Sequence, residues 1–281
     1  MEKESKPILK KIKLNPIPFI LGLLWLVFSF YPIVYLFMTS LRSQEGFLTD
    51  SPWLPPKNPT LENYTNIFKE GILKFFLNSL IVSIVSVLII ILITVACSYV
   101  IVRTKTKLVQ TTFKVLLIGL AIPVQAAIIP VYILIIKLGL YDTLIGLILP
   151  SVAFLVPLTT LILVNFIRDI PNSLYESMQL DGISHFGLLK HLVFPLSKPA
   201  IMTVAIYDFV QVWNNFLFPL VLTQSEDKQL LPLAIVSFKG EFSINVPLLM
   251  AAVMVSGLPL ILLYIFGRKY LLKGLTAGFS K

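Results

Sequence analysis

Residues 75–102 read FFLNSLIVSIVSVLIIILITVACSYVIV, and this stretch decides the fold because it contains no Asp, Glu, Lys or Arg. About 20 consecutive apolar residues in a helix cross the roughly 30 Å of hydrocarbon in a bilayer. A backbone inside lipid must satisfy its own hydrogen bonds, and the stretch lacks the strict alternation of a barrel strand. Residues 75–102 are therefore predicted to form a transmembrane helix.

Five further apolar blocks resemble this stretch in length, and among all six the only charged residue is Asp208. They cover residues 18–40, 115–136, 144–167, 201–223 and 246–267. The chain is 57% hydrophobic and only 13% charged, whereas a soluble domain carries about 25% charged residues. We therefore predict an all-α, polytopic membrane protein with six transmembrane helices in a single domain over residues 1–281.

The basic residues predict the orientation of the chain in the membrane. The net charge is +9, and with the N-terminus inside, most of the 23 Lys and Arg residues fall in inside segments. The positive-inside rule then places both termini in the cytoplasm. The first apolar block is too long for the core of a signal peptide and lacks a small-residue cleavage site, so it is interpreted as a true span.

The segment between the fourth and fifth blocks, residues 168–200, is predicted to be a cytoplasmic loop of two short helices. Ser173 and Glu176 have the spacing of a capping box at the start of the first helix. Gly182 can end that helix in the left-handed conformation. Ser184 can cap a second helix, which is predicted to end before Pro195.

Apolar side chains in the first of these helices leave two interpretations open. Leu174, Met178 and Leu180 could fill a groove on another protein, or they could rest on the lipid headgroups. The periodicity alone favours neither interpretation.

The same loop resembles the EAA loop of ABC importer permeases. Glu176-Ser-Met-Gln-Leu-Asp181-Gly182 is followed by Pro195 and Pro199 at the spacing of the family. Three alanines and one leucine of the family pattern are replaced here by Ser177, Met178, Ile183 and Phe194. The resemblance implies a coupling helix that docks in a cleft of an ATPase subunit. Its residues would be Tyr175, Glu176, Ser177, Met178, Leu180, Asp181 and Gly182.

Four other stretches are similar to the maltose-type sugar permeases, specifically to the shorter of the two paired subunits. They are residues 61–68 (LENYTNIF), 77–83 (LNSLIVS), 213–219 (WNNFLFP) and 272–279 (LKGLTAGF). Many members of that group have Glu at the position of Asn215. The resemblance implies the type I ABC importer permease fold and a permease for a carbohydrate, either a di- or an oligosaccharide.

The resemblance also implies an assembly in the cytoplasmic membrane of a prokaryote. This chain would pair with a second permease subunit as a heterodimer above two ATP-binding subunits. An extracytoplasmic sugar-binding protein would deliver the substrate. ATP and Mg would bind to the partner ATPase, and this chain would bind no cofactor.

Polar side chains within the apolar blocks are the candidates for a substrate path. A charged residue in a span is costly, so Asp208 should face protein or water; it could line the path or hydrogen-bond to another helix. Amide and aromatic side chains are suited to sugars, but amides also join helices. The candidates are Asp208, Gln211, Trp213, Asn214, Asn215 and Gln125.

The motifs of catalysis are missing from the sequence. It contains no Walker Gly-Lys-Ser/Thr loop and no His-Glu-x-x-His, and its single cysteine, Cys97, excludes an internal disulfide and a cysteine-based metal site. We predict a transport subunit with no catalytic residue, no metal site and no nucleic-acid partner, rather than an enzyme. The alternative is a secondary transporter or channel that works without ATP, which would be expected to carry charged residues in several spans.

Overall fold

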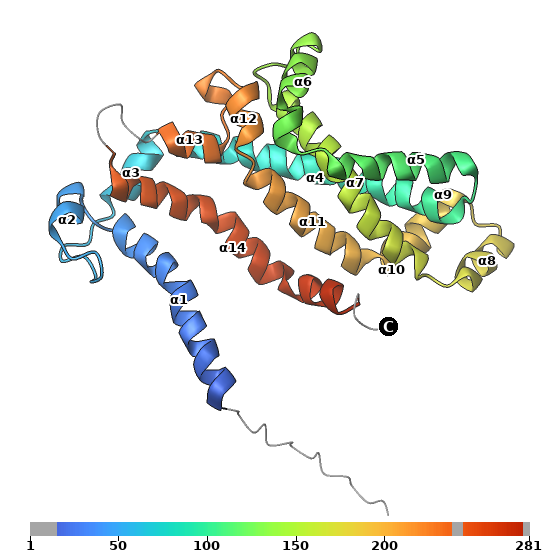
Figure 1. Ribbon diagram of the computed structural model, residues 1–281, viewed down its shortest axis with the longest axis horizontal. Helices are drawn as coiled ribbons and strands as arrows, with labels where there is room; N and C mark the ends of the chain where they lie inside the picture. The colour runs from blue at the N-terminus through green and yellow to red at the C-terminus, as the bar shows by residue number, and fades with distance from the viewer. Residues whose placement is uncertain (1–15, 238–243, 278–281) are drawn as a thin grey trace, which may run out of the picture.

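The computed structural model describes residues 16–237 and 244–277, and every regular element in these ranges is helical. The molecule is elongated, and short helices lie at one end and at the other (Figure 1). We call the first the α3 end, which holds α2 (Gln44–Thr49) and α3 (Glu62–Lys69). The opposite α8 end holds α8 (Asn172–Leu180) and α9 (His185–Leu188).

Four helices are long and apolar enough to cross a membrane. They are α1 (Pro16–Ser40), α4 (Ile72–Arg103), α7 (Leu144–Arg168) and α14 (Val246–Ala277). Two bent helix pairs raise the number of spans to six if each pair is counted as one span. The all-α membrane fold is therefore confirmed, with up to six spans in the described part of the chain.

The two bent pairs differ in where they break. The first joins α5 (Lys107–Ile118) and the 3-10 turn η1 (Gly119–Ala121) to α6 (Val124–Lys137), with a bend of 107°. The second joins α9, the π-helical turn η2 (Leu189–Val193) and α10 (Phe194–Leu196) to α11 (Lys198–Trp213), with a bend of 77°.

Two of the predicted spans contain a break in the helix. The stretch 115–136 breaks at Ile122, which is extended because the following Pro123 disfavours a helical backbone before it. The stretch 201–223 breaks after Trp213 and resumes as α12 (Leu217–Leu222). At this break the Asn215 Oδ1 accepts a hydrogen bond of 3.1 Å from the backbone N–H of Phe218, an alternative to the helical ladder that Asn often takes.

The central helix of the fold is α4, which packs along α7 and α11. Three clusters of buried hydrophobic residues follow it from the α3 end to the α8 end. By contrast, α1 lies against α14 and buries only Thr39 and Ser40 in this chain. A helix that is apolar on all sides and not covered by protein is suited to a lipid environment.

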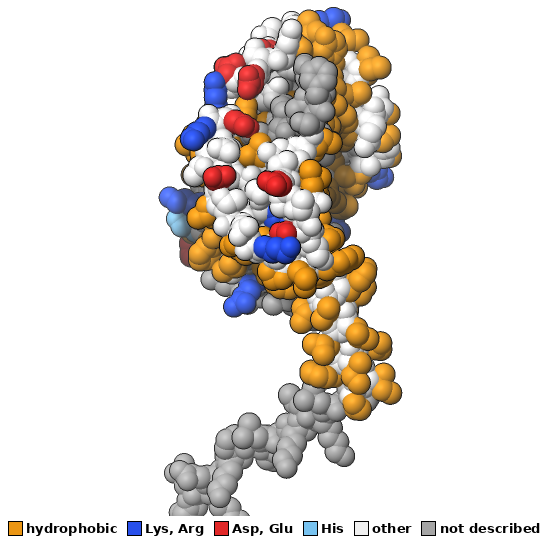
Figure 2. Space-filling view, turned by 90° about the vertical axis from the view of Figure 1, so that its left-hand side faces the viewer, with side chains coloured by type: hydrophobic (Ala, Val, Ile, Leu, Met, Phe, Trp, Pro, Cys, Tyr) orange, Lys and Arg blue, Asp and Glu red, His pale blue; other side chains and the backbone are white. Residues whose placement is uncertain are grey.

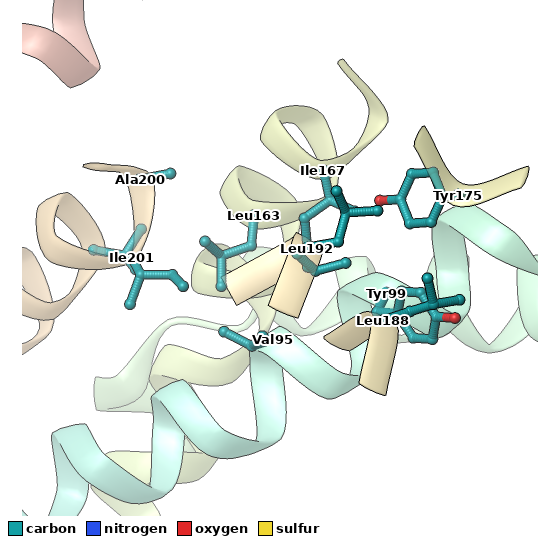
Figure 3. Packing of buried hydrophobic residues seen from close by; sticks show 11 residues of the cluster. Val95, Tyr99, Leu163, Ile167, Tyr175, Leu188, Leu192, Ala200 and Ile201 are labelled. Carbon is teal, nitrogen blue, oxygen red and sulfur yellow. The ribbon is translucent and has the colours of Figure 1, made fainter. Parts of the chain in front are cut away.

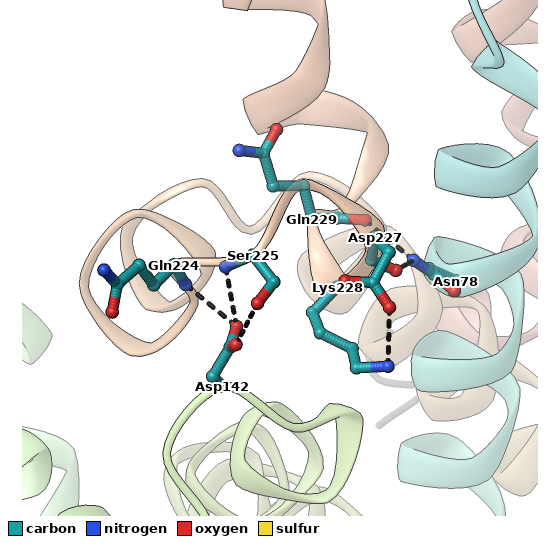
Figure 4. A network of polar contacts seen from close by, with 7 residues as sticks. All are labelled: Asn78, Asp142, Gln224, Ser225, Asp227, Lys228 and Gln229. Atoms are coloured by element: carbon teal, nitrogen blue, oxygen red, sulfur yellow. Dashed lines mark hydrogen bonds and ion pairs between the residues drawn. The ribbon is translucent and has the colours of Figure 1, made fainter.

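Polar contacts join the loops at the α3 end (Figure 4). Asp142, between α6 and α7, accepts hydrogen bonds from the backbone N–H groups of Gln224 (2.9 Å) and Ser225 (3.0 Å) and from the Ser225 hydroxyl. On the other side of this segment, Asn78 of α4 donates to two carbonyls, at 2.9 and 3.0 Å, those of Asp227 and Gln229. Residues 223–230 are thereby fixed both to α4 and to the loop before α7 (Figure 4).

We expect Asp142 to make the stability of the protein depend on acid pH. The hydrogen bond from the Ser225 hydroxyl, with those from two backbone N–H groups, lowers the pKa of Asp142. A carboxyl with a lowered folded-state pKa stabilises the fold above its unfolded pKa of about 3.9, and this contribution is lost as the pH falls through the folded value. Thermal unfolding of the detergent-purified protein from neutral to acid pH should show that the wild type is more stable than Asp142→Asn at pH 7. The difference in melting temperature between the two proteins should become smaller below about pH 4.

Glu226→Gln is the matched control for this measurement, because Glu226 is an exposed acid in the same segment. It should leave the melting temperature unchanged at every pH. A gap between wild type and Asp142→Asn that stays constant down to the lowest pH would contradict the assignment.

Candidate functional site

The first helix of the 168–200 loop, α8, begins earlier than the capping box predicts. Its first residue is Asn172, and Pro171 occupies the position before it, with no side-chain cap. The predicted cap by Ser173 and Glu176 is therefore wrong. Proline is tolerated directly before a helix, where no helical N–H bond is lost. The helix therefore begins two residues before the expected position, and Ser173 lies in its first turn.

The end of α8 is as predicted. Gly182 has φ +77°, and its N–H donates to the carbonyl of Gln179 at 3.0 Å, while the N–H of Ile183 donates to that of Met178 at 3.1 Å. These two bonds form a Schellman motif, in which a residue in the left-handed conformation closes the helix. The prediction that Gly182 ends this helix is confirmed.

The second helix of the loop starts as predicted but runs further. The Ser184 hydroxyl accepts a hydrogen bond of 3.3 Å from the N–H of Gly187, so Ser184 is the cap. The predicted end before Pro195 is wrong, because the chain passes through the π-helical turn η2 and Pro195 lies in the first turn of α10. The helix from His185 to Leu196 is continuous through this turn, in which the N–H of Phe194 donates to the carbonyl of Leu189, five residues earlier.

The loop packs tightly against the rest of the protein on its inner side (Figure 3). Tyr175 is the only buried residue of α8, with 1% of its surface exposed. It joins a hydrophobic cluster made by the loop with α4, α7 and α11, and Met178 packs against the same cluster. The other members of the cluster are Val95, Tyr99, Leu163, Ile167, Leu188, Leu192, Val193, Ala200, Ile201 and Val204.

The outer side of the loop is exposed and mixes apolar with acidic groups. Leu180 is 89% exposed and Phe186 is 74% exposed. Glu176, Ser177 and Asp181 are also exposed. The predicted coupling residues thus divide into two sets: Tyr175 and Met178 face the protein, whereas Leu180 and the polar residues are available to a partner.

Two of the substrate-path candidates are buried and hold helices together. Asp208 of α11 is fully buried, and the Thr159 hydroxyl of α7 lies 3.0 Å from both of its carboxylate oxygens. Trp213 is 1% exposed, and its Nε1–H donates to the carbonyl of Ser256 in α14 at 3.1 Å. Asp208 and Trp213 therefore join α11 to its two neighbours, and in this conformation neither opens onto a path.

Two other candidates lie on an open face of α11. Gln211 and Asn214 are exposed, and Tyr207, one turn earlier, is 38% exposed. Residues 207, 211 and 214 follow the i, i+4, i+7 spacing of one helical face. Tyr207 was not among the residues predicted for the path, although this spacing could have identified it. Of the remaining candidates, Asn215 caps the turn before α12, and Gln125 is exposed in the first turn of α6.

No group of three or more His, Cys, Asp or Glu side chains in the described ranges is placed to hold a metal ion. Two exposed surfaces are candidates for function. The first is the exposed side of the 168–200 loop, called the α8 loop from here on. The second is the polar face of α11, defined by residues 207, 211 and 214.

The chain is similar to known proteins in sequence and in fold. The model of the family described as binding-protein-dependent transport system inner membrane component matches residues 102–276. A putative ABC transporter permease of Caldicellulosiruptor sp. is 35% identical, over 94% of this chain and 96% of its own length. The diacetylchitobiose uptake permease NgcG of Streptomyces coelicolor is 33% identical, over 88% of this chain and 83% of its own length.

A third relative and a solved structure extend these findings. The melibiose/raffinose/stachyose import permease MelC of Bacillus subtilis is 30% identical, over 90% of this chain and 91% of its own length. A chain in the crystal structure of a bacterial ABC transporter that imports alginate superimposes with a TM-score of 0.82. The match covers 91% of this chain and 95% of that chain at 19% identity, and it confirms the predicted importer permease fold.

Substitution of Gly182 should loosen α8 specifically. Gly182→Ala places a side chain at φ +77°, which costs about 1–2 kcal/mol, whereas Gly182→Asn should cost less because Asn tolerates this conformation. We expect faster amide hydrogen exchange in α8 for Gly182→Ala, with Gly182→Asn between it and the wild type. Gly257→Ala in α14, where a new methyl group meets no atom within 4 Å, should leave exchange in α8 unchanged. Equal exchange in all four proteins would contradict this role of Gly182.

Proposed function

This chain belongs to the family of binding-protein-dependent transport system inner membrane components, and on that premise we propose that it couples ATP hydrolysis on a partner to the import of a carbohydrate. The family description, an inner membrane component of a transport system, supports a transport role for this chain. The observation that supports coupling is the α8 loop, which is fixed to the helices on one side and exposed on the other.

The exposed side of the α8 loop is the surface proposed to contact the ATP-binding subunit. Leu180 provides exposed apolar area, with the exposed charges of Glu176, one turn earlier in α8, and Asp181 beside it. An apolar centre with a polar rim is the usual composition of a protein interface. The lipid headgroup alternative is less suited to α8, because the charged residues of this helix and its C-cap are Glu176 and Asp181, whereas anionic lipids attract basic groups.

The proposed substrate is a di- or oligosaccharide. Two of the relatives are named for the uptake of diacetylchitobiose and of melibiose, raffinose and stachyose. The polar face of α11 adds a chemical argument, since Gln211 and Asn214 can hydrogen-bond to hydroxyls and Tyr207 can cover an apolar ring face. We propose that residues 207, 211 and 214 line the substrate path, in place of Asp208 and Trp213.

The proposed assembly places the α8 end in the cytoplasm with both termini, as the distribution of basic residues favours. A second permease subunit would cover the polar face of α11, and two ATP-binding subunits would carry ATP and Mg. An extracytoplasmic sugar-binding protein would meet the α3 end, where acidic side chains gather (Figure 2). Its exposed acids include Glu45, Glu62, Glu70 and Glu226. An alginate importer in complex with its periplasmic protein shares this fold, with a TM-score of 0.66.

The coupling proposal is tested by copurification of the tagged chain, coexpressed with the candidate second permease and ATP-binding subunits. Glu176→Lys reverses a charge on the exposed side of α8, and Gly182→Pro is incompatible with φ +77°. Both variants should lose the ATP-binding subunit and keep the second permease. Glu62→Lys, the same charge reversal at an exposed site of the α3 end, should keep both. Retention of the ATP-binding subunit by both loop variants would rule out the loop as the docking site.

The substrate path is tested by uptake kinetics in proteoliposomes. Gln211→Ala and Asn214→Ala should each raise the KM for sugar roughly three- to tenfold, the effect of losing one hydrogen bond to a neutral group, with little change in melting temperature. Trp213→Phe, which removes the bond to Ser256, should lower the melting temperature and leave the KM unchanged. A raised KM for Trp213→Phe, with an unchanged KM for Gln211→Ala and Asn214→Ala, would instead place Trp213 on the path and exclude the two amides.

A further inference from the structure

The last residue of α4 holds α8 by two directional contacts. The Arg103 guanidinium lies over the ring of Tyr175, with its carbon 4.3 Å from the ring centroid. Its Nη1 donates a hydrogen bond of 2.7 Å to the side-chain oxygen of Asn172. Tyr175 is the one side chain that α8 buries, so Arg103 fixes the ring that anchors the helix. A cation over a desolvated aromatic ring is a stronger contact than an exposed one.

One turn earlier, α4 also holds the second helix of the loop. The Tyr99 hydroxyl and His185 Nδ1 lie 2.8 Å apart in a hydrogen bond. The rings of Tyr99 and Tyr175 are stacked, with centroids 6.4 Å apart (Figure 3). The final turn of α4 therefore contacts α8 and α9 together, and it braces the Asp-Gly corner between them.

The other helices around the loop contact it in a less directional way. Leu163 and Ile167 of α7 pack against the loop through apolar surface, and such contacts tolerate sliding. In the described part of the chain, the side-chain hydrogen bonds from α8 and α9 to another helix both go to α4. A displacement of α8 should therefore be transmitted to α4 through these side chains, in addition to the chain connection by which α7 ends at Arg168, shortly before Asn172.

At its opposite end α4 is tied to the α3 end of the molecule. Asn78 bonds two carbonyls of the 223–230 segment, and the Ser79 hydroxyl accepts a bond of 2.8 Å from the N–H of Leu231 in α13 (Leu231–Ser237). The helix has 32 residues and at 1.5 Å per residue spans about 48 Å. One continuous helix thus connects the coupling loop to the loops on the other side of the membrane.

We propose that α4 is the element that carries the movement of the α8 loop across the membrane, and that Arg103 and Tyr99 are the positioning residues that make loop and helix one rigid unit. The proposal rests on the proposed function, because it assumes an ATP-binding subunit that moves α8. It adds the route by which that movement reaches the substrate side.

The first test uses the complete transporter in proteoliposomes, with sugar import and ATP hydrolysis measured on the same sample. Arg103→Ala should keep the ATP-binding subunit bound, but the sugar imported per ATP hydrolysed should fall roughly two- to thirtyfold, the range of mutations along a coupling route. Arg103→Lys retains a cation over the ring and should restore part of the ratio. Lys105→Ala removes an exposed charge two residues away and should leave the ratio unchanged.

Two results of this test would overturn the proposal. If import and hydrolysis fall together in Arg103→Ala, with an unchanged ratio, the residue supports only the folding of the loop. If the wild-type chain does not bind an ATP-binding subunit, the proposed function fails and this proposal fails with it. If the ATP-binding subunit copurifies and Arg103→Ala leaves the ratio of sugar imported to ATP hydrolysed unchanged, this proposal fails while the proposed function stands.

A distance measurement tests the same idea with Arg103 in place. In a Cys97→Ala background, spin labels replace the exposed Gln179 of α8 and Val100 of α4. Their distance distribution in the assembled transporter should be the same with and without ATP. A shift between the two states would show that the loop moves independently of α4 and would overturn the proposal.

Discussion

A bilayer offers no hydrogen bonds to a polypeptide, and the structure depends on that constraint more than on any single contact. Backbone groups are satisfied within helices, and the two breaks in predicted spans are each stabilised locally. Pro123 has no N–H to leave unpaired, and the Asn215 side chain accepts the N–H of Phe218. Helices can therefore stop inside apolar stretches only where a side chain or a missing donor compensates for the lost ladder.

The same constraint explains the placement of polar side chains. Asp208 is bonded to Thr159, and the Trp213 indole to a carbonyl of α14. Each of these hydrogen bonds fixes α11 against a neighbouring helix. Polar residues that the sequence suggests for a substrate path thus hold helices together. Two of these helices, α7 and α11, also pack against the α8 loop in one hydrophobic cluster. The loop is therefore held by helices that are themselves fixed to one another.

The sequence predicts the elements of this fold better than it predicts their breaks. Uncharged stretches identify the long helices, because apolar length alone determines whether a span is stable. The left-handed turn at Gly182 was predictable for a similar reason, since few other residues adopt it without strain. The break at Ile122 has a signal in the sequence, the following Pro123. The break at residues 214–216 and the π-turn before Pro195 were not predictable, because no single residue type at these positions requires them. The division of the coupling residues, with Tyr175 inward and Leu180 outward, likewise required the position of α4.

The open face of α11 has a consequence for the life of the chain in the cell. Tyr207, Gln211 and Asn214 lie uncovered on an apolar helix, and amide groups left in hydrocarbon carry a cost in free energy. A newly inserted copy that finds no cover for this face would be the less stable form and the natural target of membrane quality control. The amount of this chain that escapes degradation would then depend on the supply of the subunit that covers α11. The two subunits would therefore have to be synthesised in matching amounts.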